Sequence, residues 1–148
     1  MNARTITAVV GAIILLLGLA GLLYPERVLG VLGLAIAQPG YAAGPLGEVR
    51  ATYGGLFVVM GVFTLLAAVD PPRHRARILF VALLWLGAFG GRLFGVIRDG
   101  GPGLPGWLAL AFELVMGGAL LIAAQSAGAA PEDAVPAPVA AAITTPTD

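Results

Sequence analysis

Apolar residues dominate the chain in four long runs, each of which ends at prolines, glycines or charged residues. The runs cover about residues 6–24, 48–69, 76–97 and 105–125. Each run is long enough to cross the hydrocarbon core of a bilayer as an α-helix, which takes about 20 residues. The pattern therefore predicts an all-α protein whose residues 1–125 form a bundle of four transmembrane helices.

The composition supports a membrane protein, because 59% of the residues are hydrophobic and only 11% are charged. The mean hydropathy of +0.96 is also high for a soluble domain. A chain of 148 residues has room for four spans and their connections, but not for a separate soluble domain. We expect the lipid bilayer to be its main partner. The net charge of zero gives no indication of a nucleic-acid partner, and we expect none.

The connection between the first two runs, residues 25–47, is long for so small a bundle. Apolar residues recur in it at helical spacing, at Val28, Leu29, Leu32, Ala35 and Ile36. This spacing predicts a short helix on the outer membrane surface. Two alternatives remain open, namely that the segment extends the first helix past a kink at Pro25, or that it plugs the mouth of the bundle.

After the fourth run the chain becomes rich in alanine and proline and carries several acidic residues. Such a segment buries too little apolar surface to fold by itself. We therefore predict a disordered tail over residues 126–148.

The arginines are distributed unevenly between the loops, which predicts the orientation of the bundle. Positive residues concentrate in cytoplasmic loops. One side would carry Arg4, Arg73, Arg75 and Arg77, against Arg27 and Arg98 on the other. Both termini are therefore expected in the cytoplasm.

All the basic residues are arginine, in a chain rich in alanine and glycine, which is typical of a GC-rich bacterial genome. We therefore expect a multi-pass protein of the bacterial inner membrane. An alternative makes the first run a signal peptide with a cleavage motif at residues 35–37. The apolar run ends well before that motif, and Glu26 and Arg27 interrupt the interval.

Charged residues interrupt the apolar runs at Glu48, Arg50, Arg92 and Glu113. In the predicted topology all four fall in the outer half of the bilayer, with Arg92 roughly 7.5 Å and Glu113 roughly 12 Å deep. Ionisable residues in membrane helices are costly and are commonly paired. We predict that Arg92 pairs with Glu113, that Glu48 and Arg50 complete the network from the side, and that Tyr53 adds a hydroxyl.

Two interpretations of this polar cluster remain open. Buried charges fix the register of helices in some bundles. Alternatively, the cluster lines a pocket for a small amphipathic ligand, a lipid or a quinone, or contacts a membrane partner subunit. On the second interpretation the candidate binding residues are Glu48, Arg50, Tyr53, Arg92, Asp99 and Glu113.

The third run carries a ridge of small residues, Gly87, Gly91 and Gly95. Residues of this kind let helices approach closely in lipid. We expect the ridge to serve helix packing within the bundle, and the alternative is the seam of a homo-oligomer.

Few residues could carry enzyme chemistry. The chain has no cysteine, which excludes disulfides, thiolate metal sites and cysteine nucleophiles. Its single histidine, His74, lies among arginines in a loop. We predict no catalytic residues, no metal site and no cofactor, and we favour a non-enzymatic binding or accessory protein.

A resemblance to a known family lies in the segment GEVRATYGG at residues 47–55, together with Gly91-Arg92, Asp99-Gly100 and Glu113. Over about residues 5–125 the chain resembles small four-helix bacterial membrane proteins known only as a domain of unknown function. The resemblance supports the topology and these positions, and implies no reaction.

More distantly, the four-helix plan is similar to DoxX-like membrane proteins, some of which are associated with quinone-linked sulfur oxidation. This likeness implies an alternative function as a redox accessory, with Glu113 as a proton carrier beside a quinone. A small transporter is a third possibility. No motif in this chain carries the redox activity over, and the chain has no internal repeat of the kind found in transporters.

Overall fold

The computed structural model describes residues 2–36 and 39–128. Four helices in this part of the chain are long and apolar enough to cross a membrane: Ala3–Leu23, Ala43–Val69, Arg75–Asp99 and Gly103–Gly128. The prediction of an all-α fold with four membrane-length helices is thereby confirmed. The fold is compatible with a multi-pass membrane protein.

The elements follow one another as α1 (Ala3–Leu23), α2 (Pro25–Val31), η1 (Pro39–Tyr41), α3 (Ala43–Val49), η2 (Arg50–Gly55), α4 (Leu56–Val69), α5 (Arg75–Asp99) and α6 (Gly103–Gly128). The elements α3, η2 and α4 join into one continuous helix. This helix begins at Ala43, several residues before the predicted start near residue 48.

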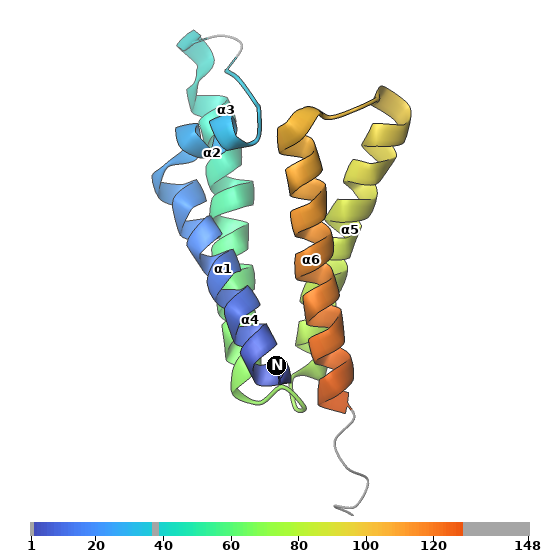
Figure 1. Cartoon of the computed structure of the whole chain (residues 1–148). Helices are drawn as coiled ribbons and strands as arrows, with labels where there is room; N and C mark the ends of the chain where they lie inside the picture. Colours follow the sequence, from blue (N-terminus) through green and yellow to red (C-terminus); the bar gives the residue numbers. More distant parts are fainter. Residues whose placement is uncertain (1, 37–38, 129–148) are drawn as a thin grey trace, which may run out of the picture.

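The long helices form two antiparallel hairpins, α1 with α4 and α5 with α6, and α1 also packs against α6. Figure 1 shows the hairpins leaning together at the end that carries the N-terminus. They diverge toward the opposite end, where α2 and α3 lie. We call this opposite end the α2 end.

Glycines bring α1 and α4 into close contact in the first hairpin. A Cβ atom added to Gly18 would lie 2.5 Å from the backbone nitrogen of Val58, and one added to Gly61 would lie 2.6 Å from that of Leu15. No side chain fits at these distances, so the two backbones can meet only because these positions lack one. The first hairpin is therefore specified by its glycines.

The predicted packing of Gly87, Gly91 and Gly95 within the bundle is wrong. An added Cβ would meet nothing within 4 Å at Gly87 or Gly91, and at Gly95 only Asp99 of the same helix, 4.0 Å away. The ridge lies on the outer surface of α5. A sequence pattern of small residues does not state which neighbour they face, and here no helix of the described bundle covers them.

The core lies where the two hairpins meet, around Ile14, Ile78 and Leu120. Two buried hydroxyls there, of Thr7 and Thr64, each donate a hydrogen bond of 2.7 Å to the carbonyl four residues earlier. This bonding satisfies polar groups that would otherwise be costly in an apolar interior.

The connection after α1 forms a short helix across the diverging end of the bundle. Tyr24 interrupts the helical backbone, and α2 begins at Pro25, where a proline is well tolerated. Leu29 is buried, and α2 ends at Val31. The predicted helix is therefore right for Val28 and Leu29, whereas Leu32, Ala35 and Ile36 lie beyond its end.

The chain after α2 reaches the start of α6. Gly33 has a φ of +71°, which only glycine adopts readily, and a Cβ added there would lie 3.5 Å from the ring of Pro105. The chain after α2 therefore reaches from the first hairpin to α6 of the second.

The fourth helix is longer than predicted, because α6 continues to Gly128. Residues 126–128, which we assigned to the tail, are helical, and Gly128 packs against Arg75. The rest of the predicted tail, residues 129–148, lies outside the described residues.

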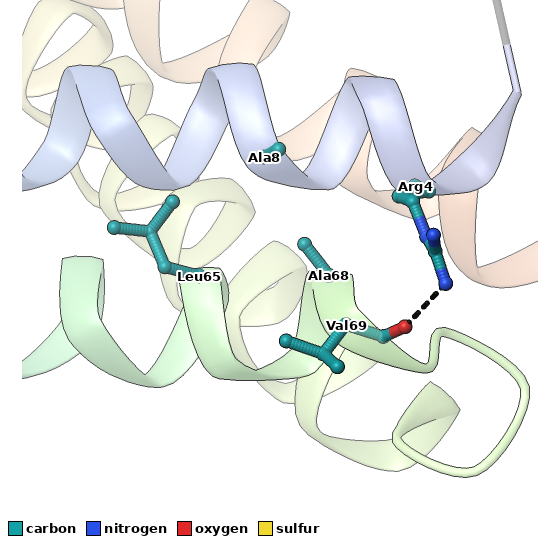
Figure 2. Close-up of a pocket in the computed structure, with 5 residues that line it drawn as sticks. All are labelled: Arg4, Ala8, Leu65, Ala68 and Val69. Atoms are coloured by element: carbon teal, nitrogen blue, oxygen red, sulfur yellow. Dashed lines mark hydrogen bonds between the residues drawn. The ribbon is translucent and has the colours of Figure 1, made fainter.

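At the N-terminal end of the bundle, Arg4 caps the C-terminus of α4. Its Nη2 donates a hydrogen bond of 2.6 Å to the carbonyl oxygen of Val69, as Figure 2 shows. Arginine commonly satisfies a free carbonyl at a helix C-terminus in this way. The shallow hollow around this contact is lined otherwise by apolar side chains, so its one charged group already has a structural role.

Candidate functional site

A cavity of about 640 Å³ lies at the α2 end, with walls from both hairpins and from α2. Its walls are mainly apolar, with side chains such as Leu17, Val28 and Leu108. Ligand pockets typically measure about 300–1,000 Å³ and combine apolar walls with a few polar groups. The cavity therefore has the size and lining of a small-molecule site.

The pair Arg92–Glu113 forms one edge of the cavity. Nε of Arg92 donates to both carboxylate oxygens at 3.1 Å, and Nη2 donates to Oε1 at 2.8 Å. Glu113 is only 5% exposed, whereas the Arg92 side chain is 33% exposed. The predicted pairing of these two residues is confirmed. The bonding compensates for the cost of burying the carboxylate.

Helix connectivity explains why Arg92 and Glu113 meet. A short turn containing Gly100, whose φ is +98°, joins α5 to the antiparallel α6. Arg92 lies roughly two turns before the end of α5, and Glu113 roughly three turns after the start of α6. The long arginine side chain bridges the remaining difference in height.

Tyr53 lies in η2, where the helix widens into a π-turn. The N–H of Leu56 donates to the carbonyl oxygen of Ala51, five residues earlier. Such wide turns occur frequently at functional sites, because the extra residue changes which face a side chain occupies. Tyr53 lines the cavity together with the ion pair.

The backbone of Tyr53 is held by α1. A Cβ on Gly21 would collide with the Tyr53 carbonyl group, so this part of η2 packs directly on the glycine. The position of the tyrosine therefore depends on the same glycine contacts that join α1 to α4.

A row of aromatic rings connects the two hairpins at the cavity. Tyr53 and Phe57, Phe57 and Trp85, and Trp85 and Phe112 stack edge to face, with ring centroids 5.7, 5.3 and 5.4 Å apart. All four residues line the cavity. Edge-to-face pairs add to the stability gained by burial. The row therefore supplies both a wall of the cavity and a contact between the hairpins.

Sequence reasoning missed Phe57, Trp85 and Phe112. Each of the last three predicted spans carries more than one aromatic residue. The sequence does not show which of these residues lie at the same height, because that depends on how the helices pack. The indole Nε1 of Trp85 is buried and has no hydrogen-bond partner among the described residues.

A second arginine reaches the cavity from α2. Arg27 lines it, as does Tyr24, and the Arg27 guanidinium lies 5.4 Å from the centroid of the Tyr24 ring. Both side chains are exposed, so they stand at the mouth of the cavity. Arg27 is not among the candidate binding residues predicted from the sequence.

Three predicted site residues lie apart from the cavity. Glu48, Arg50 and Asp99 are exposed, do not line it, and form no ion pair within residues 2–36 and 39–128. The predicted completion of the network by Glu48 and Arg50 is therefore not observed. The structure brings together Tyr53, Arg92 and Glu113 from the predicted set.

No group of three or more histidine, cysteine or acidic side chains capable of holding a metal ion occurs in the described part of the chain. The polar groups of the cavity are guanidinium, phenol, indole and one carboxylate. This set is suited to hydrogen bonding and charge recognition.

Comparison with known proteins gives a family without an activity. No curated protein and no solved structure matches the chain. The DoxX-like resemblance stays a prediction. A family model described as "Domain of unknown function (DUF4345)" matches residues 2–124, a range that contains the whole cavity. The resemblance to an uncharacterised family is thus confirmed, and the chain belongs to the DUF4345 family.

Proposed function

We propose that the protein binds a small amphipathic ligand in the cavity between its hairpins, as a non-enzymatic, multi-pass protein of the bacterial inner membrane with cytoplasmic termini. The observation that supports this most directly is the composition of the cavity. Its apolar walls end at one edge in the bonded pair Arg92–Glu113. An amphipathic molecule fits such a site because its apolar body and its polar head find matching surfaces.

The volume of the cavity supports a binding role over a purely structural one. An ion pair that only fixed helix register would be best surrounded by closely packed side chains, since voids reduce stability. Here the pair borders about 640 Å³ of space beside an aromatic wall. A ligand would recover the contacts that this space leaves unmade.

The geometry favours binding over the alternative of a redox accessory. In that alternative Glu113 would carry protons to and from a quinone. Both of its oxygens accept hydrogen bonds from Arg92. Glu113 would have to break these bonds to pass a proton to a quinone, so its placement suits a fixed partner of Arg92 better than a proton carrier.

Filling the cavity tests the proposal. Ala109 lines it, whereas Ala111, on the same helix, is exposed and does not. The full-length protein would be purified in mild detergent as wild type, Ala109→Phe and Ala111→Phe, and its bound small molecules counted by native mass spectrometry. We expect a bound amphiphile, a lipid or a quinone, in wild type and Ala111→Phe, and its loss in Ala109→Phe.

A second variant distinguishes a specific loss of ligand from misfolding. Tyr53→Phe keeps the ring contact with Phe57 and removes only a hydroxyl, so it should fold normally and retain less ligand. Circular dichroism would confirm that each variant is folded. Wild type without ligand, or equal ligand content in wild type and folded Ala109→Phe, would refute the proposal and return the ion pair to a purely structural role.

A further inference from the structure

The polar groups at the cavity edge offer many hydrogen-bond donors and few acceptors. Glu113 is the acidic residue of the lining, and both its oxygens already accept from Arg92. Arg92 uses Nε and Nη2 in these bonds, while Nη1 has no partner within the described residues. The Arg27 guanidinium and the Tyr53 hydroxyl add further donors.

The charge of the lining is also one-sided. Arg92 and Glu113 cancel, which leaves the positive charge of Arg27 at the mouth. Glu26 precedes Arg27 on α2 but does not line the cavity, as expected since successive helical residues point in different directions. A donor-rich, positive edge favours a ligand group that accepts hydrogen bonds and carries negative charge.

From these observations we propose that the ligand is a single-chain amphiphile with an anionic oxygen head group, a carboxylate or a phosphate ester. Its head binds between Arg27 and the free edge of Arg92, and its chain lies along the aromatic row. This inference rests on the proposed function, because it assigns a chemical class to the same ligand. Glu113 then acts as a positioning residue, since it fixes the Arg92 guanidinium without touching the head group.

The two tryptophans make a direct test available. Trp85 lines the cavity and is 5% exposed, whereas Trp107 is 50% exposed and does not line it. In Trp107→Phe, fluorescence comes from the cavity alone. In Trp85→Phe the fluorescence comes from Trp107 on the outer surface of α6, and its quenching measures how much probe enters the bilayer. Both full-length variants would be placed in phosphatidylcholine nanodiscs.

The probes are a brominated fatty acid, a brominated alkyl phosphate and a brominated fatty alcohol of equal chain length, because bromine quenches tryptophan on contact. After correction for the quenching of Trp107, we expect Trp85 to be half-quenched by one or both anions at about tenfold lower concentration than by the alcohol. A difference between the two anions identifies the head group.

Arg27→Gln, made in the Trp107→Phe background, should abolish the tenfold preference for anions and leave quenching by the alcohol unchanged. Arg98→Gln is the matched control, because it removes one positive charge at the same end of the bundle without touching the cavity. It should preserve the preference.

The outcomes separate the two proposals. Equal quenching by acid, phosphate and alcohol in the parent protein would overturn the anionic head group but leave an amphiphile site. Equal loss of preference in Arg27→Gln and Arg98→Gln would overturn the role of Arg27. Quenching of Trp85 that never exceeds that of Trp107 for any probe would refute the binding cavity itself.

Discussion

The guanidinium of Arg92 holds both oxygens of the Glu113 carboxylate, in a contact that joins α5 to α6 beside the cavity. The burial of the two partners differs. Glu113 is almost fully enclosed, whereas a third of the Arg92 side chain remains exposed. The carboxylate therefore depends on its partner more than the arginine does.

This asymmetry gives the first prediction. Arg92→Ala should cost about 3 kcal/mol in the free energy of unfolding, because it leaves a buried carboxylate unpaired. Glu113→Ala should cost less, because Arg92 can reach a polar environment by itself. The double variant should cost less than the sum of the two.

Unfolding in increasing denaturing detergent, followed by circular dichroism, measures these effects. Arg98→Ala serves as the control, since Arg98 is exposed and lies near the end of the same helix. Strictly additive costs would mean that the pair contributes no coupling energy.

The second prediction contrasts two glycines in membrane-length helices. Gly18→Ala places a methyl group 2.5 Å from the Val58 backbone and should destabilise the fold by about 2 kcal/mol, as overpacking does. Gly91→Ala meets nothing within 4 Å and should instead stabilise α5 by about 0.5 kcal/mol through helix propensity.

The same detergent titration measures both glycine variants. Destabilisation by Gly91→Ala would reveal a partner on the outer face of α5. A parallel measurement of molecular mass would then show whether that partner is a second copy of the chain, the alternative that the sequence left open.

Particular residues show how far the sequence determines this structure. Hydropathy locates the spans, and the prolines, glycines and charged residues between them mark their ends, because these are local properties of the chain. The Arg92–Glu113 pair was predictable because a short turn fixes α5 and α6 as antiparallel neighbours. The number of residues between each side chain and the turn then gives its position along the bundle axis.

The failures share a different cause. Glu48 and Arg50 would be expected near the pair if the second span began there, but the helix starts earlier, at Ala43, and widens at η2. Such a wide turn has no clear sequence signature. Likewise, Gly18 of α1 and Gly91 of α5 both lie in apolar helical segments, and only the neighbouring helix distinguishes the packed glycine from the open one.

The third prediction concerns Trp85, whose N–H is buried without a partner among the described residues. Trp85→Phe removes this unsatisfied donor and keeps a ring between Phe57 and Phe112, so its cost should be below about 1 kcal/mol. Trp85→Ala removes the central ring and should cost about 3 kcal/mol or more.

Thermal unfolding of both Trp85 variants tests this expectation, with Trp107→Phe as the exposed control. A large loss in Trp85→Phe, equal to that in Trp85→Ala, would indicate that the indole N–H has an acceptor, such as a retained ligand.

The last prediction concerns orientation. Figure 1 places the N-terminus and the turn between α4 and α5 at one end of the bundle, and α3 at the other. By the distribution of arginine, the first end should face the cytoplasm.

Because the chain has no cysteine, single cysteines at His74 and Glu48 can be labelled without a background. In intact cells, a membrane-impermeant maleimide should label the cysteine at Glu48 and reach the one at His74 only after the inner membrane is opened. The reverse pattern would invert the protein and place the mouth of the cavity on the cytoplasmic side, where its ligand would have to be supplied from within the cell.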